Sequence, residues 1–246
     1  MVIPLGAGQS RRRLAAEAWR FRFQVEREAH LRFGRLAGRL AGIGASGALQ
    51  ALALRASEDE FRHATRCAER CLLEGGTTTG LVSPGAPEIA ASALSPRQRV
   101  LYEVMAACCV TESGSMGVLS ALLGAARGRG LRRVLRELAA DEVGHARLGW
   151  AVLAAERGGE DVRVLGPFLP AMLAGNAGPG LYAPGTNPAE DDEALLEHGV
   201  LPRAQRRAVF EDTLEAVVFP GLEACGVSAV AGRAWLANQR AALAGT

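Results

Sequence analysis

Four long segments of the chain carry the apolar spacing of amphipathic helices, and their connections restrict the fold strongly. They cover about residues 10–43, 46–74, 96–127 and 130–158, and Gly or Pro residues interrupt the pattern between them. The first and third connections are short, which predicts two antiparallel helical hairpins. The connection over residues 75–95 is longer and rich in Gly, Ser, Thr and Pro, so it can run back along a bundle. We therefore predict an all-α fold built on a four-helix bundle with one long crossover.

The rest of the chain is expected to form a helical extension. Residues 159–201 are rich in Gly and Pro, which predicts loops and short helices. Amphipathic spacing predicts two further helices at about 203–219 and 227–243, separated at Pro220 and Gly221. The predicted domains are residues 1–160 for the bundle and 161–246 for the extension, which packs on the bundle and could cap a site inside it.

One short motif occurs twice, once in the second helical segment and once in the fourth. The two copies are Asp59-Glu60-Phe61-Arg62-His63 and Asp141-Glu142-Val143-Gly144-His145. Glu and His three positions apart project from one face of a helix, about 5–6 Å from each other, so both can reach one metal ion. Each pair lies in an otherwise apolar stripe, where an ionised carboxylate is costly unless it is paired, protonated or bound to metal. One Glu-x-x-His arises often by chance, but two copies in long helices favour a metal site.

A two-metal site in such a bundle also needs a carboxylate from each of the other two helices. In the first segment Glu26 shares a stripe with Trp19 and Phe23, whereas Glu28 belongs to a polar stripe. That polar stripe also holds Arg32, Arg35 and Arg39, and we assign it to solvent. The midpoint between Glu26 and Glu60 is residue 43, inside the predicted turn. Glu26 is therefore the better candidate in this segment.

The third segment offers Glu103 and Glu112. Glu112 shares its stripe with Met105 and Leu119, and its midpoint with Glu142 is residue 127, again in a predicted turn. The corresponding midpoint for Glu103 falls near residue 122, inside a helix, so we choose Glu112.

The predicted metal ligands, which would also be the catalytic residues, are Glu26, Glu60, His63, Glu112, Glu142 and His145. Four carboxylates and two imidazoles suit iron or manganese. Asp59 and Asp141 are expected to accept a hydrogen bond from the free N–H of a ligand histidine. His30 lies four residues after Glu26 on the same face. It could be a further ligand, support a ligand, or simply pack near the helix edge, and the sequence leaves these alternatives open.

This six-residue pattern resembles the ferritin-like di-iron carboxylate superfamily, which includes ferritins, rubrerythrins, the small subunit of ribonucleotide reductase, acyl-carrier-protein desaturases and bacterial multicomponent monooxygenases. The resemblance covers about residues 10–158, and the Asp-Glu-x-x-His form of both motifs is most similar to the oxygen-activating members. The chain as a whole is similar to uncharacterised bacterial ferritin-like domain proteins. The resemblance implies a ferritin-like bundle with two iron ions, or manganese in place of one or both. It also implies an oxidase or oxygenase that activates O2 to oxidise a small organic substrate.

Two other functions stay open. The alternative to an oxygenase is a ferroxidase or another iron-handling protein without an organic substrate, although a bare storage protein would not need the extension. A third possibility is a bundle used only for protein interaction. The chain has no Cys-x-x-Cys pair, so electrons would come from an external donor, and its five Cys fit no disulfide framework.

Charge and apolar runs restrict the partners. The net charge of +2, with acids and bases well mixed, argues against a nucleic-acid partner. The first residues hold no apolar run suited to a signal peptide, and no run approaches the roughly 20 residues of a membrane span. We therefore expect a cytoplasmic protein without a membrane partner, and a homodimer is one option for its assembly.

Overall fold

The computed structural model describes residues 7–82, 85–178, 180–183 and 187–245. Every regular element within these ranges is helical, which confirms the predicted all-α class. Residues 1–6, on which the expectation about a signal peptide partly rests, lie outside the described residues, and so do residues 83 and 84 of the long connection.

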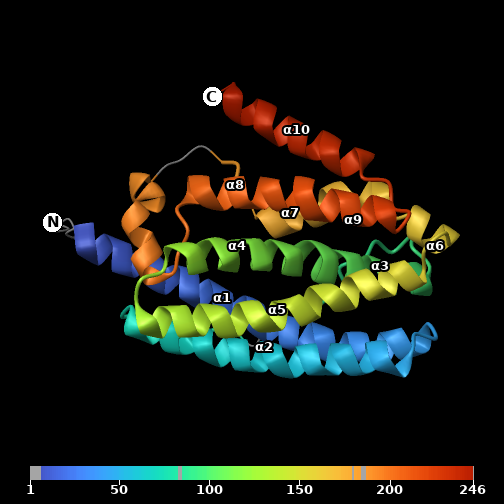
Figure 1. Ribbon diagram of the computed structural model, residues 1–246, viewed down its shortest axis with the longest axis horizontal. Coiled ribbons are helices and arrows are strands. Elements are labelled where there is room, and N and C mark those ends of the chain that lie inside the picture. Colours follow the sequence, from blue (N-terminus) through green and yellow to red (C-terminus); the bar gives the residue numbers. More distant parts are fainter. Residues whose placement is uncertain (1–6, 83–84, 179, 184–186, 246) are drawn as a thin grey trace.

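Long helical rods lie side by side in the lower and middle part of the molecule as drawn in Figure 1. They are α1 (Ala7–Gly42), α2 (Gly47–Leu73), the continuous rod of α3 (Pro96–Val104), η1 (Met105–Thr111) and α4 (Glu112–Ala125), and α5 (Arg129–Ala155). The α1–α2 turn uses Gly44 at a φ of 76°, and Ser46 caps α2 by accepting a hydrogen bond from the Leu49 N–H. The rods form two hairpins, α1–α2 and the third rod with α5, which pack together mainly through α2 and α5.

The connection between α2 and α3 runs from one end of the rods to the other. At its start, Arg12 near the beginning of α1 donates to the Leu73 carbonyl at 2.7 Å. At its end, Arg97 of α3 donates to the Ile43 carbonyl in the α1–α2 turn at 2.8 Å. Ser95 and Gln98 then form a capping box that begins α3. The connection therefore crosses the length of the rods, as its length and composition predict.

The C-terminal extension packs mainly on the third rod, and part of it contacts α1. Its elements are α6 (Glu160–Arg163), η2 (Gly166–Phe168), α7 (Leu169–Ala177), η3 (Pro188–Asp191), η4 (Glu193–His198), α8 (Arg203–Thr213), η5 (Leu214–Val218), α9 (Phe219–Ala224) and α10 (Val230–Ala244). Figure 1 shows α7, α8 and α9 along one side of the rods, with α10 outside them. Leu173 and Phe219 of the extension belong to the same apolar cluster as Met105 and Leu148 of the rods.

The predicted helix break at Pro220 and Gly221 is wrong. The chain stays helical from Arg203 to Ala224, through the π-helical segment η5. Pro220 occupies one of the first positions of α9, where a missing N–H is tolerated. Gly221 serves close packing, because a Cβ there would lie 2.7 Å from ring atoms of Trp150. The chain turns only at Gly226, whose φ is 90°.

The polar stripe of α1 that we assigned to solvent is partly covered by the long connection, although the Glu28 side chain stays 44% exposed. Arg32 is 7% exposed, and its guanidinium donates to Glu103, which is fully buried, at 2.9 Å. Arg39 donates to the other Glu103 oxygen at 2.5 Å, and Arg35 also pairs with Glu103. Arg35 and Arg32 further donate to carbonyl groups of residues 86 and 87 in the connection. One carboxylate of α3 thus fixes three arginines of α1, and these hold the connection in place.

The third rod meets the length and composition criteria for a membrane span over Pro96–Ala125. This corrects the expectation that no stretch of the chain does so. The rod carries the buried acids Glu103 and Glu112 and packs against other rods, and a buried core helix meets the same criteria, so this stretch is weak evidence for a span.

Replacing Glu103 by Gln is expected to lower the free energy of unfolding by about 3–5 kcal/mol, because it removes the fully buried negative charge that three arginines of α1 share. The measurement is urea unfolding followed by circular dichroism. The matched control is Glu88→Gln, since the Glu88 side chain is 41% exposed and pairs with Arg39 at 3.0 Å. That change should cost at most about 1 kcal/mol. Equal losses in the two variants would contradict the role given to Glu103.

Candidate metal centre

A polar layer separates two apolar clusters along the rods. One cluster contains Phe33 of α1 and Leu148 of α5, and the other contains Trp19 of α1 and Leu138 of α5. On each rod the predicted ligands fall between the residues of these two clusters, as Glu26 does between Trp19 and Phe33. Packed side chains on both sides therefore keep bulk water from this layer.

The structure brings all six predicted ligands together in this layer. Ligand atoms of Glu60, Glu112, Glu142 and His145 lie within 4.8 Å of one another, and those of Glu26, Glu60 and His63 form a second such group. Glu60 belongs to both groups, so its two oxygens can serve both. Glu60, His63, Glu142 and His145 are each at most 1% exposed.

His145 is held by carboxylates from two rods. Its Nδ1 lies 2.9 Å from Glu142 Oε2 and 3.0 Å from Glu60 Oε1. The other Glu142 oxygen accepts a hydrogen bond from the Ser115 hydroxyl at 3.0 Å. Ser115 lies on α4, three residues after Glu112, so the third rod supports Glu142 in addition to supplying its own carboxylate.

Burial and crowding shift the acidities of the cluster in opposite directions. Burial and the neighbouring carboxylates of Glu60 and Glu142 raise the pKa of both Glu26 and Glu112 well above the usual range. Burial alone would raise the pKa of Glu60, but the adjacent imidazoles of His145 and His63 outweigh it and lower that pKa to about 2. Burial alone would lower the pKa of His145, but hydrogen bonds to Glu142 and Glu60 raise it to about 11. Protons therefore balance part of the negative charge, and bound cations can take over that role.

Two buried atoms at the centre of the cluster make no hydrogen bond. They are Glu60 Oε2 and His63 Nδ1, which lie 3.3 Å apart. A buried polar atom without a partner costs about 1–3 kcal/mol, and the cost is greater for a charged group. A metal ion bound to both atoms would remove that cost. The carboxylate and imidazole donors of this cluster are those that iron and manganese accept, so the residues present fit a metal site.

Asp59 and Asp141 contact the cluster histidines in an exchanged arrangement. His63 Nε2 of α2 lies 3.1 Å from Asp141 Oδ2 of α5, and His145 Nε2 of α5 lies 3.3 Å from Asp59 Oδ2 of α2. Each aspartate thus contacts the histidine of the other motif. With the Nε2 proton directed to an aspartate, Nδ1 is left as the metal-binding nitrogen.

Arg62, which the sequence does not single out, spans the two aspartates. Its guanidinium lies 2.6 Å from Asp59 Oδ1 and 3.1 Å from Asp141 Oδ2. The Arg62 side chain is 50% exposed, so it covers the edge of the cluster that faces solvent. Its place between Glu60 and His63 in the motif could have drawn attention to Arg62, but spacing alone does not say where its side chain points.

His30 is not part of the cluster. Its Nδ1 lies 2.8 Å from the Ser57 carbonyl oxygen and 3.0 Å from the Ser57 hydroxyl. Its ring contacts Phe61, with the centroids 5.5 Å apart. The expected contact between His30 and a ligand is therefore not met. The physical reason is that four residues turn a helix by about 400°, so His30 is rotated by about 40° from Glu26, toward α2.

A π-helical segment sets the position of Glu112. The segment η1 ends at Thr111, whose hydroxyl donates to the Ala106 carbonyl at 3.0 Å. Such wide turns occur frequently at functional sites, because each one rotates the residues that follow it. Gly149 of α5 allows close approach at η1, since a Cβ there would lie 2.5 Å from the Cys108 Cβ.

The cysteines of the rods are buried free thiols, as expected for small apolar side chains. Cys67 Sγ lies 3.9 Å from Glu26 Oε1, and burial raises the pKa of the Cys67 thiol well above its usual value. A thiol in this state is not a reactive nucleophile.

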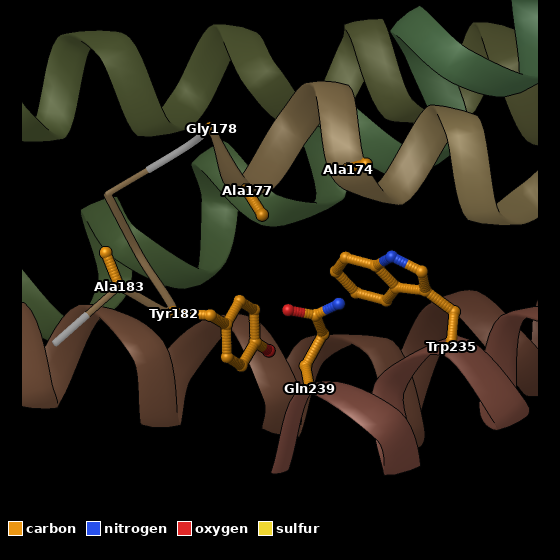
Figure 2. A pocket seen from close by; sticks show the side chains of 7 residues that line it. All are labelled: Ala174, Ala177, Gly178, Tyr182, Ala183, Trp235 and Gln239. Atoms are coloured by element: carbon orange, nitrogen blue, oxygen red, sulfur yellow. The ribbon is translucent and has the colours of Figure 1, made fainter. Parts of the chain in front are cut away.

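The extension has a pocket of its own, of about 470 Å³, between α7 and α10. Figure 2 shows the Gln239 side chain near the rings of Tyr182 and Trp235, which meet edge to face with centroids 5.7 Å apart. None of the six cluster residues lines this pocket. The link from α7 to the rods is Asn176, whose amide donates to the Thr111 hydroxyl at 3.1 Å.

Comparisons with known proteins add no relative: no family model, no curated protein and no solved structure matches the chain.

Replacing Asp141 by Asn is expected to weaken metal binding about 10–100-fold, because the amide no longer fixes the tautomer and orientation of His63. Asp59→Asn should act in the same way through His145. The measurement is calorimetric titration of the metal-free protein with Mn²⁺ or Fe²⁺ under argon. Asp212→Asn on the exposed face of α8 is the control and should leave the affinity unchanged. Wild-type affinity in both cluster variants would show that the aspartates do not position the histidines.

Replacing Gly149 by Ala is expected to destabilise the protein by about 1–3 kcal/mol, because the added methyl group overlaps Cys108. Thermal unfolding measures the effect. Gly144→Ala on the same helix is the control, since its Cβ would meet no atom within 4 Å, and it should stabilise by about 0.5–1 kcal/mol. A neutral Gly149→Ala would mean that α5 and η1 are less closely packed than described.

Proposed function

We propose that this chain is a ferritin-like di-metal carboxylate oxidoreductase that holds two iron ions and activates O2 to oxidise a small organic substrate. The observation that carries the proposal is a pair of buried atoms that make no hydrogen bond, Glu60 Oε2 and His63 Nδ1, inside a cluster of acids and imidazoles. The hairpin–crossover–hairpin order of the rods supports the ferritin-like assignment, since that topology places one long connection between two antiparallel pairs.

The donor set supports two divalent ions. Glu26 and Glu112 supply carboxylates from α1 and the third rod, while each motif supplies one carboxylate and one imidazole. Four negative charges match two divalent cations, and hard oxygen donors with two nitrogens suit iron, with manganese as an alternative in one or both positions. When bound, the two ions supply the electrons and the Lewis acidity that reduction of O2 requires.

The side chains around the cluster have separate roles in this proposal. Asp59 and Asp141 hold the histidine Nε2 protons, so that both Nδ1 atoms stay directed inward. Ser115 orients Glu142 by donating to its Oε1. The apolar clusters above and below exclude water, which protects reactive species from side reactions. The raised pKa values of the buried thiols keep them protonated, which makes them unsuited to redox roles. Electrons would therefore come from an external donor.

A ferroxidase would use the same cluster without an organic substrate. The extension argues for the first function, because it shares an apolar cluster with α3 and η1 of the third rod and goes beyond what iron oxidation needs. A storage protein would take up many iron atoms per chain and form a large shell, so iron titration and sizing separate the two functions.

The central test is anaerobic Fe²⁺ titration of the metal-free protein, followed by exposure to O2 in a stopped-flow spectrometer. We expect about two ions per chain and a transient absorption band that depends on O2. Glu60→Ala should abolish binding of both ions, because Glu60 belongs to both ligand groups. Glu69→Ala, at an exposed position on the same helix, is the control and should bind both ions normally.

Thermal unfolding gives a second reading of the same titration. Iron at 100 times its dissociation constant should stabilise the wild type and Glu69→Ala by about 2.7 kcal/mol per site, and should leave Glu60→Ala unchanged. Absence of metal binding in the wild type would end the proposal. Uptake of many iron atoms per chain would replace the oxygenase with a storage function.

A further inference from the structure

A second cavity lies between side chains of α1 and α2. It has a volume of about 470 Å³, within the range of small-molecule sites. Its lining includes Phe23, Arg27 and His30 of α1 and Phe61, Ala64 and Ala68 of α2. We call it the α1–α2 groove.

The groove uses the same helical turns as the metal ligands. Arg27 directly follows Glu26, and Ala64 follows His63. Ala64 is 4% exposed and offers only a methyl group to the groove.

The walls of the groove are apolar. The rings of Phe23 and Phe61 line it together with alanine methyl groups, and the Phe61 side chain is 62% exposed although it is large and apolar. His30 uses Nδ1 for Ser57, so only its Nε2 is left for another contact. An apolar molecule would gain free energy by covering these surfaces.

Arg27 provides a single free positive charge. Its guanidinium lies over the Phe23 ring, 5.4 Å from the centroid, and makes no ion pair with any carboxylate in the described part of the chain. Some arginines of α1 have acidic partners, as Arg13 has Glu17 and Arg32 has Glu28, whereas Arg20 and Arg22 make no ion pair among the described residues but do not line the groove. A guanidinium matches a carboxylate through two parallel hydrogen bonds.

We propose that the α1–α2 groove binds a small carboxylic acid with an aliphatic or aromatic body. Its carboxylate pairs with the Arg27 guanidinium, and its body lies between Phe23 and Phe61 over Ala64. The inference that such an acid binds depends only on the groove. The inference that such acids are the substrates of the oxidoreductase depends on the proposed function as well.

The test begins with calorimetric titration of the full chain, metal-free and iron-loaded, with hexanoate, octanoate, decanoate and octanol. Affinity should rise about fourfold for each added methylene until the groove is filled. Octanol should bind about 10–100-fold more weakly than octanoate, because it cannot make the charge-assisted pair with Arg27. Equal affinities for octanoate and octanol would overturn the proposal.

Two variants separate the charge from the cavity. Arg27→Gln should remove the preference for octanoate over octanol, while Ala68→Leu should fill the groove and weaken both at least 10-fold. Arg55→Gln and Ala51→Leu, at exposed positions of α2 that do not line the groove, are the controls and should bind as the wild type does. Thermal unfolding of Ala68→Leu shows whether it folds, and Arg27→Gln tests the charge independently.

The remaining outcomes are distinct. Iron uptake without binding of any acid would overturn the groove assignment and leave the proposed function intact. Binding of the acids without iron uptake would end the proposed function and leave the groove site in place. If the chain formed a dimer that Ala68→Leu dissociated, and no acid bound, the groove would be the contact surface for a second copy of the chain. That outcome would overturn the proposal.

Discussion

Four carboxylates cannot stay ionised together in an apolar interior without positive charge between them, and the rest of the structure follows from that constraint. Glu26, Glu60, Glu112 and Glu142 lie in one layer, with packed apolar side chains on both sides. Two imidazoles and a set of protons hold this layer together in the protein chain alone. Cations bound there can replace the protons, so the free energy of metal binding adds to the stability of the fold.

Much of the architecture could be predicted because each rod repeats one period over many residues. Strong periodicity and Gly-rich turns located the four rods to within a few residues. The apolar stripe then chose Glu26 over Glu28, and the hairpin midpoint chose Glu112 over Glu103. These choices need only the register of a helix and the place of a turn. The same reasoning does not prove a metal, and the ligand roles of these residues stay predictions.

Other features depend on contacts between segments far apart in the sequence, and spacing within one helix cannot reveal them. The sequence predicts Arg32 at the surface, but Glu103 and the long connection cover it in the structure. Pro220 reads as a helix break, but η5 before it and Trp150 beside Gly221 make a continuous helix possible. His30 was a candidate for contact with a ligand, but a rotation of about 40° from Glu26 directs it to another neighbour.

The exchanged contacts of the two aspartates bear on the order in which the protein assembles. Asp59 belongs to the first hairpin and orients a histidine of the second, while Asp141 does the reverse. Neither hairpin alone therefore contains a complete set of oriented donors, even though each carries a full Glu-x-x-His motif. In the proposed function, docking of the hairpins therefore precedes tight binding of cations during folding, and a nascent chain that has made only its first half lacks a complete site for the wrong metal.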